Sequence, residues 1–369
     1  MLSSLYIKNY RNLKELRINS LGRVNLITGK NNTGKSTILE AIAIYATKGD
    51  LIQLYQLMGE RGENFRQIDT NKNATEINMR AFSSLFTNRD GFENGNSIYI
   101  GNDEKSSSDK SVSIRFVRYF EEIQTDKNGG ILKRNIIAQG NETEKDLANY
   151  QVGIEIKVGS ESYILSLDKE RPYRFSYRVF GADTNIQFIR TRNIDKGING
   201  LLWDSITLTE REKYVIEALK IIEINTNGIA FIEENPGERT AKIKLSNSPN
   251  ILPLLSMGDG INRILTIILA LVNSDNGFLL IDEFENGLHY TVQEKLWEII
   301  FNLSQKLNVQ VFVTTHSEDS ISSFEKTLNS QEKVNGNLIR LDNIDGNIKQ
   351  VEFDKKELKI ATDNDIEIR

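Results

Sequence analysis

The feature that most constrains this chain is the segment VNLITGKNNTGKST, from Val24 to Thr37. It fits the pattern Gly-x-x-x-x-Gly-Lys-Ser/Thr at every fixed position, with Gly29 first and Gly34, Lys35 and Ser36 last. An apolar run precedes this loop and a helix-forming run follows it, which gives the expected strand, turn and helix. In that context, successive backbone N–H groups and the start of the helix face an anion. The segment therefore predicts a nucleoside triphosphate site in an α/β fold.

Each position of the loop has a predicted role. The two glycines let the backbone approach the phosphates, Lys35 reaches the β- and γ-phosphates, and the hydroxyl of Ser36 ligates Mg²⁺. The residues expected to contact the nucleotide are Gly29, Lys30, Asn31, Asn32, Thr33, Gly34, Lys35, Ser36 and Thr37. A chance glycine-rich turn would leave the flanking strand and helix patterns unexplained.

Composition excludes several classes of protein. The net charge of −5 argues against attraction of the whole surface to nucleic acid, although it allows a local basic groove. The longest apolar run, Ile264 to Val272, is far shorter than the roughly 20 residues of a membrane-spanning helix. The chain has no cysteine, so it has no disulfide framework and no thiolate chemistry. With an N-terminus that lacks the apolar block of a signal peptide, this pattern favours a cytoplasmic protein.

The chain is predicted to consist of a core interrupted by a long insertion. Residues 1–50 predict strand, turn, strand, loop and helix, and residues 250–330 alternate helix and strand, so these two blocks form the core. Residues 51–249 predict an inserted β-rich and helical subdomain, with antiparallel strands and a Thr-capped helix over 207–224. Residues 331–369 predict a hairpin and a short helix that complete the core.

The segment GFLLIDEFENGLH, from Gly277 to His289, is an apolar strand that ends in two acids. We expect this strand to lie next to the phosphate-loop strand, so that Asp282 at its carboxyl end holds Mg²⁺. Glu283 follows and can point at the γ-phosphate, where it would polarise the attacking water. A solvated strand end would explain the acids alone, but not their combination with a phosphate loop.

A third apolar strand, in LNVQVFVTTHSED, ends at His316. The same topology would carry this side chain to the γ-phosphate, where a neutral imidazole can hydrogen-bond the phosphate or the water. A surface histidine is the alternative for a residue after a strand.

The segment LLSMGDGINRIL contains Ser256, Gly258 and Gly260 directly before a long apolar helix. Small residues at a helix N-terminus allow close backbone approach to an anion. Because one nucleotide needs only one phosphate loop, this second site is expected to serve a neighbouring subunit. A glycine-rich turn that caps a core helix is the alternative.

Together these segments resemble the ABC-type ATPase heads of SMC and recombination-repair proteins, and more closely the bacterial overcoming-lysogenization-defect-like AAA family ATPases. GKNNTGKS is similar to the Walker A loop, LLSMGDG to the signature motif, FLLIDE to Walker B, ENGLH to the D-loop and TTHS to the switch-histidine segment. The resemblance covers roughly residues 1–50 and 250–330. It implies an α/β P-loop ATPase head of the ABC type, with an antiparallel β subdomain and an inserted β/α region, that binds ATP and Mg²⁺.

The resemblance also implies roles for residues outside these motifs. In IKNYRNLKEL, Tyr10 and Arg11 occupy the family's place near the adenine, and Arg11 is assigned to nucleotide binding. The Q-loop residue is not obvious. Gln187 is a candidate, and Arg190 or Arg192 could serve nearby instead.

Three departures from the family narrow the function. The signature reads SMGDG where transporter ATPases have Ser-Gly-Gly-Gln, which points away from a transport subunit. No long heptad run provides the coiled-coil arms of SMC-type proteins. The stretch after His316 is too short for the metal-dependent nuclease domain found in many family members. Within that stretch, DNIDGN predicts a hairpin turn and not a calcium loop, and Asp363 and Asp365 are expected to cap or solvate the tail.

These observations predict an ATPase that works as a homodimer or higher oligomer. ATP would be clamped between the phosphate loop of one chain and Ser256 and Gly258 of the other, then hydrolysed with Glu283 as base. The resemblance implies a separate effector protein, a nuclease or toxin, in antiphage defence. The alternative is a DNA-binding ATPase of the SMC or recombination-repair kind, with KSVSIRFVR and IRTRNIDK contacting phosphates. Those charges alternate with acids, so a solvated sheet face is favoured, and nucleic acid is not the favoured partner.

Overall fold

The structure is a computed structural model. It describes residues 1–63, 74–92, 95–102, 110–125, 131–138, 150–167, 185–191, 198–235, 238–331, 334–364 and 368. The chain divides into two compact units, which we treat separately. Unit 1 comprises Met1–Ser3, Ile18–Leu39 and Asp183–Arg369, and unit 2 comprises Ser4–Arg17 and Glu40–Ala182.

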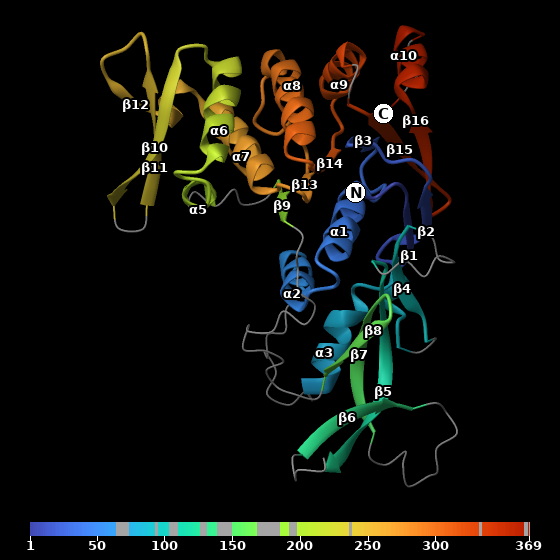
Figure 1. The fold of residues 1–369 in the computed structure, drawn as a ribbon. Coiled ribbons are helices and arrows are strands. Elements are labelled where there is room, and N and C mark those ends of the chain that lie inside the picture. Colours follow the sequence, from blue (N-terminus) through green and yellow to red (C-terminus); the bar gives the residue numbers. More distant parts are fainter. Residues whose placement is uncertain are drawn as a thin grey trace. The chain divides into compact units, whose positions relative to one another are not determined.

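Unit 1 is built on a six-stranded sheet with the order β16-β15-β3-β14-β13-β9 (Figure 1). Every neighbouring pair is parallel except the β15–β16 hairpin. The strands are β3 (Val24–Gly29), β9 (Ile186–Ile189), β13 (Phe278–Ile281), β14 (Gln310–Thr314), β15 (Gly336–Ile344) and β16 (Asn347–Phe353). The central strands β3, β13 and β14 are buried throughout, which matches their continuous apolar sequence.

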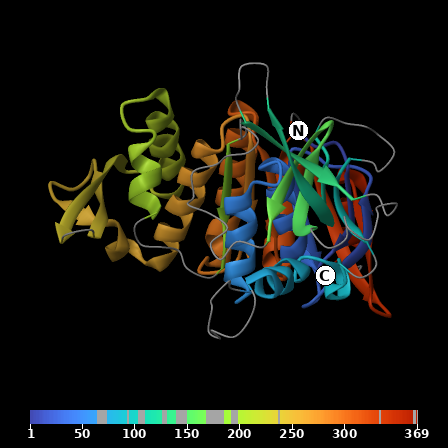
Figure 2. The same cartoon turned by 90° about the horizontal axis from the view of Figure 1, so that it is seen from below.

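Helices and a small second sheet complete unit 1. The helices are α5 (Ile198–Asp204), α6 (Glu210–Ile222), α7 (Asp259–Asn273), α8 (Tyr290–Lys306), α9 (Glu318–Ser330) and α10 (Lys355–Asp363), with a 3₁₀ turn, η2, at Leu254–Met257. In Figure 1, α8, α9 and α10 lie in a row along the large sheet. The second sheet consists of β10 (Thr226–Asn235), β11 (Glu238–Leu245) and β12 (Ile251–Pro253), and lies beside α6 (Figure 2).

The longest apolar run of the sequence forms the middle of α7. From Ile264 to Val272 its apolar side chains are almost completely buried in the core of unit 1, against residues of α6, α8 and the sheet. In the described part of the chain, no helix combines the length and apolar character needed to cross a membrane.

Unit 2 is an antiparallel sheet with accompanying helices. Its path is β2-β1-β4-β5-β7-β8, with β6 paired to β5. The strands are β1 (Leu5–Tyr10), β2 (Leu13–Ile18), β4 (Ser97–Gly101), β5 (Val112–Thr125), β6 (Ile131–Ile137), β7 (Gln151–Val158) and β8 (Glu161–Ser166). The helices are α2 (Leu51–Glu60) and α3 (Ala74–Ser83), with a 3₁₀ turn, η1, at Thr87–Arg89. Helix α1 (Lys35–Ala46) begins in unit 1 and ends in unit 2.

These features confirm the predicted fold class, an α/β P-loop nucleoside triphosphatase with an antiparallel β subdomain. The inserted strands, the Thr-capped α6 and the C-terminal hairpin and helix lie where the sequence predicts them. In the hairpin, Asp345 and Gly346 both have positive φ, of 51° and 78°, as a tight two-residue turn requires.

The division into units differs from the predicted domain boundaries. Residues 183–249 group with the phosphate-loop sheet and not with the insertion, because β9 pairs in parallel with β13. Residues 4–17 group with the inserted strands, because β1 pairs with β4. The helices α2 and α3 are a further difference, since the only helix located by the sequence within residues 51–249 is the one over 207–224.

Candidate active site

The phosphate loop joins the end of β3 to the start of α1. Gly29 has a φ of 137°, and a Cβ atom there would lie 2.4 Å from the carbonyl oxygen of Leu341. Gly34 also has a positive φ, of 90°, so both glycines of the motif are required by the backbone. Asn32 adopts the left-handed region between them, with a φ of 62°. The loop therefore curls tightly, as a phosphate cradle must.

The other loop residues differ in exposure. Lys30, Asn31 and Asn32 are exposed, whereas Thr33 and Thr37 are buried. The hydroxyl of Thr33 donates a hydrogen bond of 2.8 Å to the carbonyl of Lys30, which closes the loop on itself.

Lys35 extends back over the loop that precedes it. Its Nζ donates to the carbonyl oxygens of Gly29, at 2.6 Å, and Lys30, at 2.9 Å. Burial lowers the pKa of the Lys35 ammonium, and the nearby carboxylates, chiefly Asp282, act in the opposite direction. A half-buried cation at the start of a helix is well suited to bind a polyphosphate, because the negative charge of the phosphates would neutralise the ammonium group.

Ser36 and Asp282 meet at the carboxyl edge of the sheet. The Ser36 hydroxyl lies 3.0 Å from Oδ1 of Asp282, and the Thr314 hydroxyl lies 2.6 Å from the same oxygen. Hydroxyl and carboxylate oxygens are the ligands that Mg²⁺ prefers, so this pair fits the predicted metal role.

The sequence predicts that the strand ending at Asp282 lies next to β3. In the structure these two strands are not neighbours. Strand β14 lies between β3 and β13 and pairs in parallel with both, with Thr314 opposite Ile27 of β3. The expectation of direct adjacency is wrong because strand order depends on long-range pairing that the local pattern does not encode. The intervening strand places Thr314 beside Asp282, a contact that the sequence analysis did not anticipate.

Glu283 has a left-handed backbone, with a φ of 50°. Its N–H donates to the Thr314 hydroxyl at 2.9 Å, and the N–H of Phe284 donates to the Thr314 carbonyl at 3.0 Å. The half-buried carboxylate of Glu283 makes no hydrogen bond within the described part of the chain. It is therefore free to engage a water molecule, and its role as the base stays a prediction.

Glu285 fixes the segment that carries His316. Its carboxylate accepts hydrogen bonds from the Thr315 hydroxyl at 2.7 Å and from the His316 N–H at 2.9 Å. It also lies 2.7 Å from Nδ1 of His316, whose side chain is 54% exposed. A carboxylate at Nδ1 favours the proton on that nitrogen and leaves Nε2 as the exposed acceptor. Glu285 lies within the D-loop-like segment ENGLH, where the sequence alone gave it no role.

The segment similar to the signature motif presents small residues at the start of α7. Gly258 is the N-cap with a φ of 104°, and a Cβ atom there would meet nothing within 4 Å. Ser256 is exposed, and its hydroxyl donates to the carbonyl of Pro253 at 2.6 Å. Gly260 packs near the D-loop, since its Cβ would lie 3.2 Å from the carbonyl oxygen of Gly287. The backbone at Gly258 is thus open to an approaching ligand.

Arg11 lies in unit 2, in a buried ion pair. Its Nε is 2.7 Å from Oε2 of Glu40, and its side chain is only 8% exposed. Arg61 pairs with the other oxygen of the same carboxylate at 2.8 Å, and the Tyr10 hydroxyl donates to it at 3.1 Å. Desolvation in this network raises the pKa of the Tyr10 phenol above its ordinary range. Proximity of Tyr10 and Arg11 to adenine stays a prediction.

The Q-loop candidates occupy different positions on β9. Gln187 lies inside the strand, opposite Leu279, whereas Arg190 follows its end. The end of β9 is beside Asp282, because the N–H of Asp282 donates to the carbonyl of Ile189 at 2.8 Å. Arg192 and the tail residue Asp365 lie outside the described residues.

The second histidine serves a local structural purpose. His289 is the N-cap of α8, and its side chain accepts a hydrogen bond from the backbone N–H of Thr291. In the described ranges, no cluster of three or more His, Cys, Asp or Glu side chains has the arrangement of a metal site of its own.

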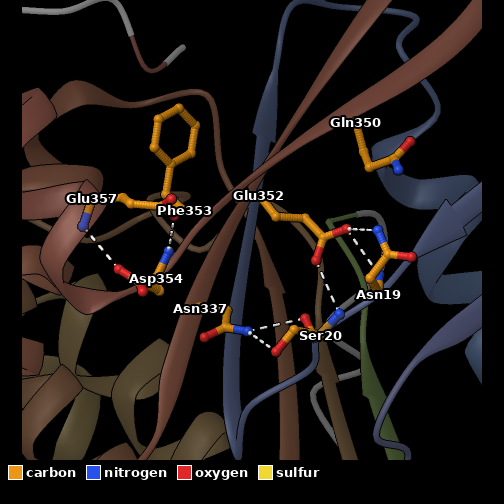
Figure 3. A pocket seen from close by; sticks show the side chains of 8 residues that line it. All are labelled: Asn19, Ser20, Asn337, Gln350, Glu352, Phe353, Asp354 and Glu357. Atoms are coloured by element: carbon orange, nitrogen blue, oxygen red, sulfur yellow. Dashed lines mark hydrogen bonds between the residues drawn. The ribbon is translucent and has the colours of Figure 1, made fainter.

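A polar cavity of about 520 Å³ lies elsewhere in unit 1 (Figure 3). It is lined by Asn19, Ser20, Asn337, Gln350, Glu352, Phe353, Asp354 and Glu357. The carboxylate of Glu352 accepts hydrogen bonds from the backbone N–H groups of Asn19, at 2.8 Å, and Ser20, at 2.9 Å. Asn337 pairs with Asn25 near the start of β3, so the cavity lies at the amino edge of the sheet. The phosphate loop lies at the opposite, carboxyl edge.

The carboxyl edge thus combines a phosphate loop with the Asp282 carboxylate beside Ser36, the Glu283 carboxylate and a histidine oriented by Glu285. Residues 1–170, which contain the phosphate loop, match the family described as AAA ATPase domain. The chain is an ATPase. Residues 237–323 of this ATPase, which contain the signature-like segment and β13, match the family described as AAA domain, putative AbiEii toxin, Type IV TA system.

Individual proteins similar to this ATPase come from bacteria and archaea. An ATP/GTP phosphatase of Helicobacter pylori is 25% identical over 360 residues, which cover 90% of each chain. An uncharacterized protein of Methanocaldococcus jannaschii is 31% identical over 136 residues, which cover 35% of this chain and 56% of that protein. Among solved structures, the Smc head domain of Pyrococcus furiosus bound to the C-terminal domain of ScpA is 14% identical, covers 99% of both chains and has a TM-score of 0.48.

Proposed function

We propose that this ATPase is Mg²⁺-dependent and works as an ATP-gated homodimer, or a higher oligomer, with composite sites. The observation that carries the proposal is the open helix N-terminus at Gly258, with its φ of 104° and no atom in the way of a Cβ. The chain already has one complete phosphate loop in β3 and α1. The start of α7, with its small residues, is therefore available to bind the nucleotide held by the phosphate loop of another copy.

Each residue at the carboxyl edge has its own role in binding or hydrolysing ATP. Lys35 binds the β- and γ-phosphates, and Ser36 and Asp282 hold the metal. Mg²⁺, when bound, neutralises the charge that develops on the phosphates. Glu283 takes up the proton of the attacking water, because its carboxylate makes no other hydrogen bond within the described residues. His316, with Nε2 as the acceptor, receives a hydrogen bond from the attacking water.

ATP hydrolysis in this ATPase regulates a separate effector, a nuclease or toxin, in antiphage defence. The family resemblance supports this role, together with the match of residues 237–323 to an AAA domain described with a toxin system. The Helicobacter pylori relative is described as an ATP/GTP phosphatase, so GTP is the second nucleotide to assay.

The alternative function is that of a DNA-binding ATPase of the repair type, whose partner would be nucleic acid. The two arginines of β5 do not favour it, because Arg115 is paired with Glu155 at 2.5 Å and Arg118 stacks on Tyr150 at 4.9 Å from the ring centroid. Double-stranded DNA should therefore neither bind tightly nor stimulate hydrolysis. Nanomolar affinity that falls steeply with salt, showing several phosphate contacts, would support the alternative instead.

Oligomeric state in the presence of nucleotide tests the proposal. The Glu283→Gln variant should bind Mg²⁺-ATP but hydrolyse it about 10²- to 10⁴-fold more slowly, because it lacks the base. Sedimentation velocity should then show ATP-dependent association of this variant and none with ADP. Gly258→Arg in the Glu283→Gln background is the matched control, because it should bind ATP and remain dissociated. Identical sedimentation with ATP and ADP would contradict the gating mechanism.

A further inference from the structure

Arg263 is a buried cation on α7 that no motif assigns. Its exposure is 3%, and its Nη2 donates to the carbonyl of Asp282 at 3.2 Å and to that of Glu283 at 3.5 Å. Within the described residues, its Nε and Nη1 have no hydrogen-bond partner. Burial lowers the pKa of the guanidinium, and the neighbouring carboxylates of Asp282, Glu283 and Glu285 act against that shift. A buried cation whose donors lack hydrogen-bond partners destabilises a core, so the position of Arg263 indicates a role other than packing.

The backbone around Glu283 shows what that role is. Two peptide groups flank its Cα atom, and its φ of 50° is one that a residue with a side chain rarely adopts. The N–H groups of both peptides donate to Thr314, one to the hydroxyl at 2.9 Å and one to the carbonyl at 3.0 Å. The carbonyl groups of both peptides face Nη2 of Arg263. Thr314 and Arg263 therefore hold the strained residue from opposite sides.

We propose that Arg263 is a positioning residue that ties the signature helix α7 to the backbone of Glu283 and so fixes the direction of the catalytic carboxylate. The inference rests on the proposed role of Glu283 as base. Because Gly258 caps the same helix, the contact also links the signature segment of a chain to the base of that chain. Displacement of α7 would then change the orientation of Glu283.

Replacement of Arg263 by methionine tests the proposal. Methionine keeps an unbranched side chain and helix propensity but offers no donor to the two carbonyls. Single-turnover hydrolysis should slow about 10- to 100-fold, as expected when a catalytic group is misplaced by about 1 Å. ATP affinity, measured by titration with a fluorescent analogue, should stay within about twofold because Lys35 and the phosphate loop are untouched. Arg211→Met on α6 is the matched control, since Arg211 pairs with Asp275 and is 36% exposed.

A double-mutant cycle with Glu283→Gln separates positioning from a general structural effect. If Arg263 acts through Glu283, Arg263→Met should have little further effect in the Glu283→Gln background. Multiplicative losses would overturn the inference, as would Arg263→Met hydrolysis at the wild-type rate or a loss confined to ATP affinity. Unchanged hydrolysis by Glu283→Gln alone would instead refute the proposed function.

Arg263→Lys keeps the test decisive if the methionine variant misfolds. It retains the charge but not the planar fork that reaches two carbonyls, so hydrolysis should still fall about tenfold at unchanged ATP affinity. A Lys variant with wild-type hydrolysis would also overturn the inference.

Discussion

Substitution of Thr314 by valine should separate the hydroxyl of this residue from its packing. The hydroxyl donates to Asp282 at 2.6 Å and accepts from the N–H of Glu283 at 2.9 Å, and valine has the same shape without either function. The lost bond to a charged carboxylate contributes about 1.5–3 kcal/mol, and the unsatisfied N–H costs about 1–3 kcal/mol. Stability should therefore fall by a few kcal/mol. Turnover should fall about 100-fold if Glu283 is displaced by about 1 Å, which corresponds to about 2.7 kcal/mol in the barrier.

Thr314→Ser is the matched control, because it retains the hydroxyl and loses only the methyl group. We expect it to keep turnover within about threefold of wild type, measured as phosphate release at saturating Mg²⁺-ATP. Denaturant unfolding of all three proteins gives the stability differences. If Thr314→Ser is impaired as severely as Thr314→Val, the methyl group and not the hydrogen bonds holds the site. If the folded valine variant keeps wild-type turnover, the reasoning about Glu283 is refuted.

Three further variants test other parts of the account. Lys35→Ala should abolish ATP binding in isothermal titration, because it removes the charge that faces the phosphates; retained binding by the folded variant would show that the site is elsewhere. Gly29→Ala should also lose ATP binding, because its Cβ would lie 2.4 Å from a carbonyl oxygen of β15, whereas Gly228→Ala, with nothing within 4 Å, should leave binding unchanged. Glu40→Ala should destabilise the protein by about 3–5 kcal/mol in denaturant unfolding, because it strands a buried arginine. The control Glu210→Ala breaks an exposed pair, with side chains 67% and 84% exposed, and should leave the unfolding midpoint almost unchanged; equal effects of the two variants would refute the argument.

The parts of the site that were predictable depend on local sequence. The phosphate loop needs glycines at fixed spacing between a strand and a helix, so the positions and backbone demands of Gly29 and Gly34 could be read from one segment. The same holds for Asp282 and Glu283 at the end of an apolar strand. The C-terminal hairpin and helix carry a tight turn at Asp345 and Gly346 and a capping box, both of which are local signals.

The parts that were missed depend on contacts between distant segments. Thr314 and Arg263 reach the backbone of Asp282 and Glu283 only because β14 lies between β3 and β13 and because Arg263 extends from α7 to the Asp282 carbonyl. Neither the strand order nor the position of α7 can be predicted from residues at a fixed spacing in the sequence. Glu285 was visible within ENGLH, but its role depends on the distant His316.

Helix α2 was missed for a different reason, since its signal was present. Its buried residues Leu51, Leu54, Leu57 and Met58 follow helical spacing, but the only helix predicted within residues 51–249 was the one over 207–224.

The central claim, that two copies of this ATPase form composite sites, is tested most directly by mixing two inactive variants. Lys35→Ala lacks the phosphate-binding charge, and Gly258→Arg places a bulky side chain where the partner's γ-phosphate should approach. With random exchange, about half of the dimers are hybrids with one of two sites intact, so turnover should recover to about a quarter of wild type. Full activity of Gly258→Arg alone, or a mixture no more active than its two components, would contradict composite sites that can work singly.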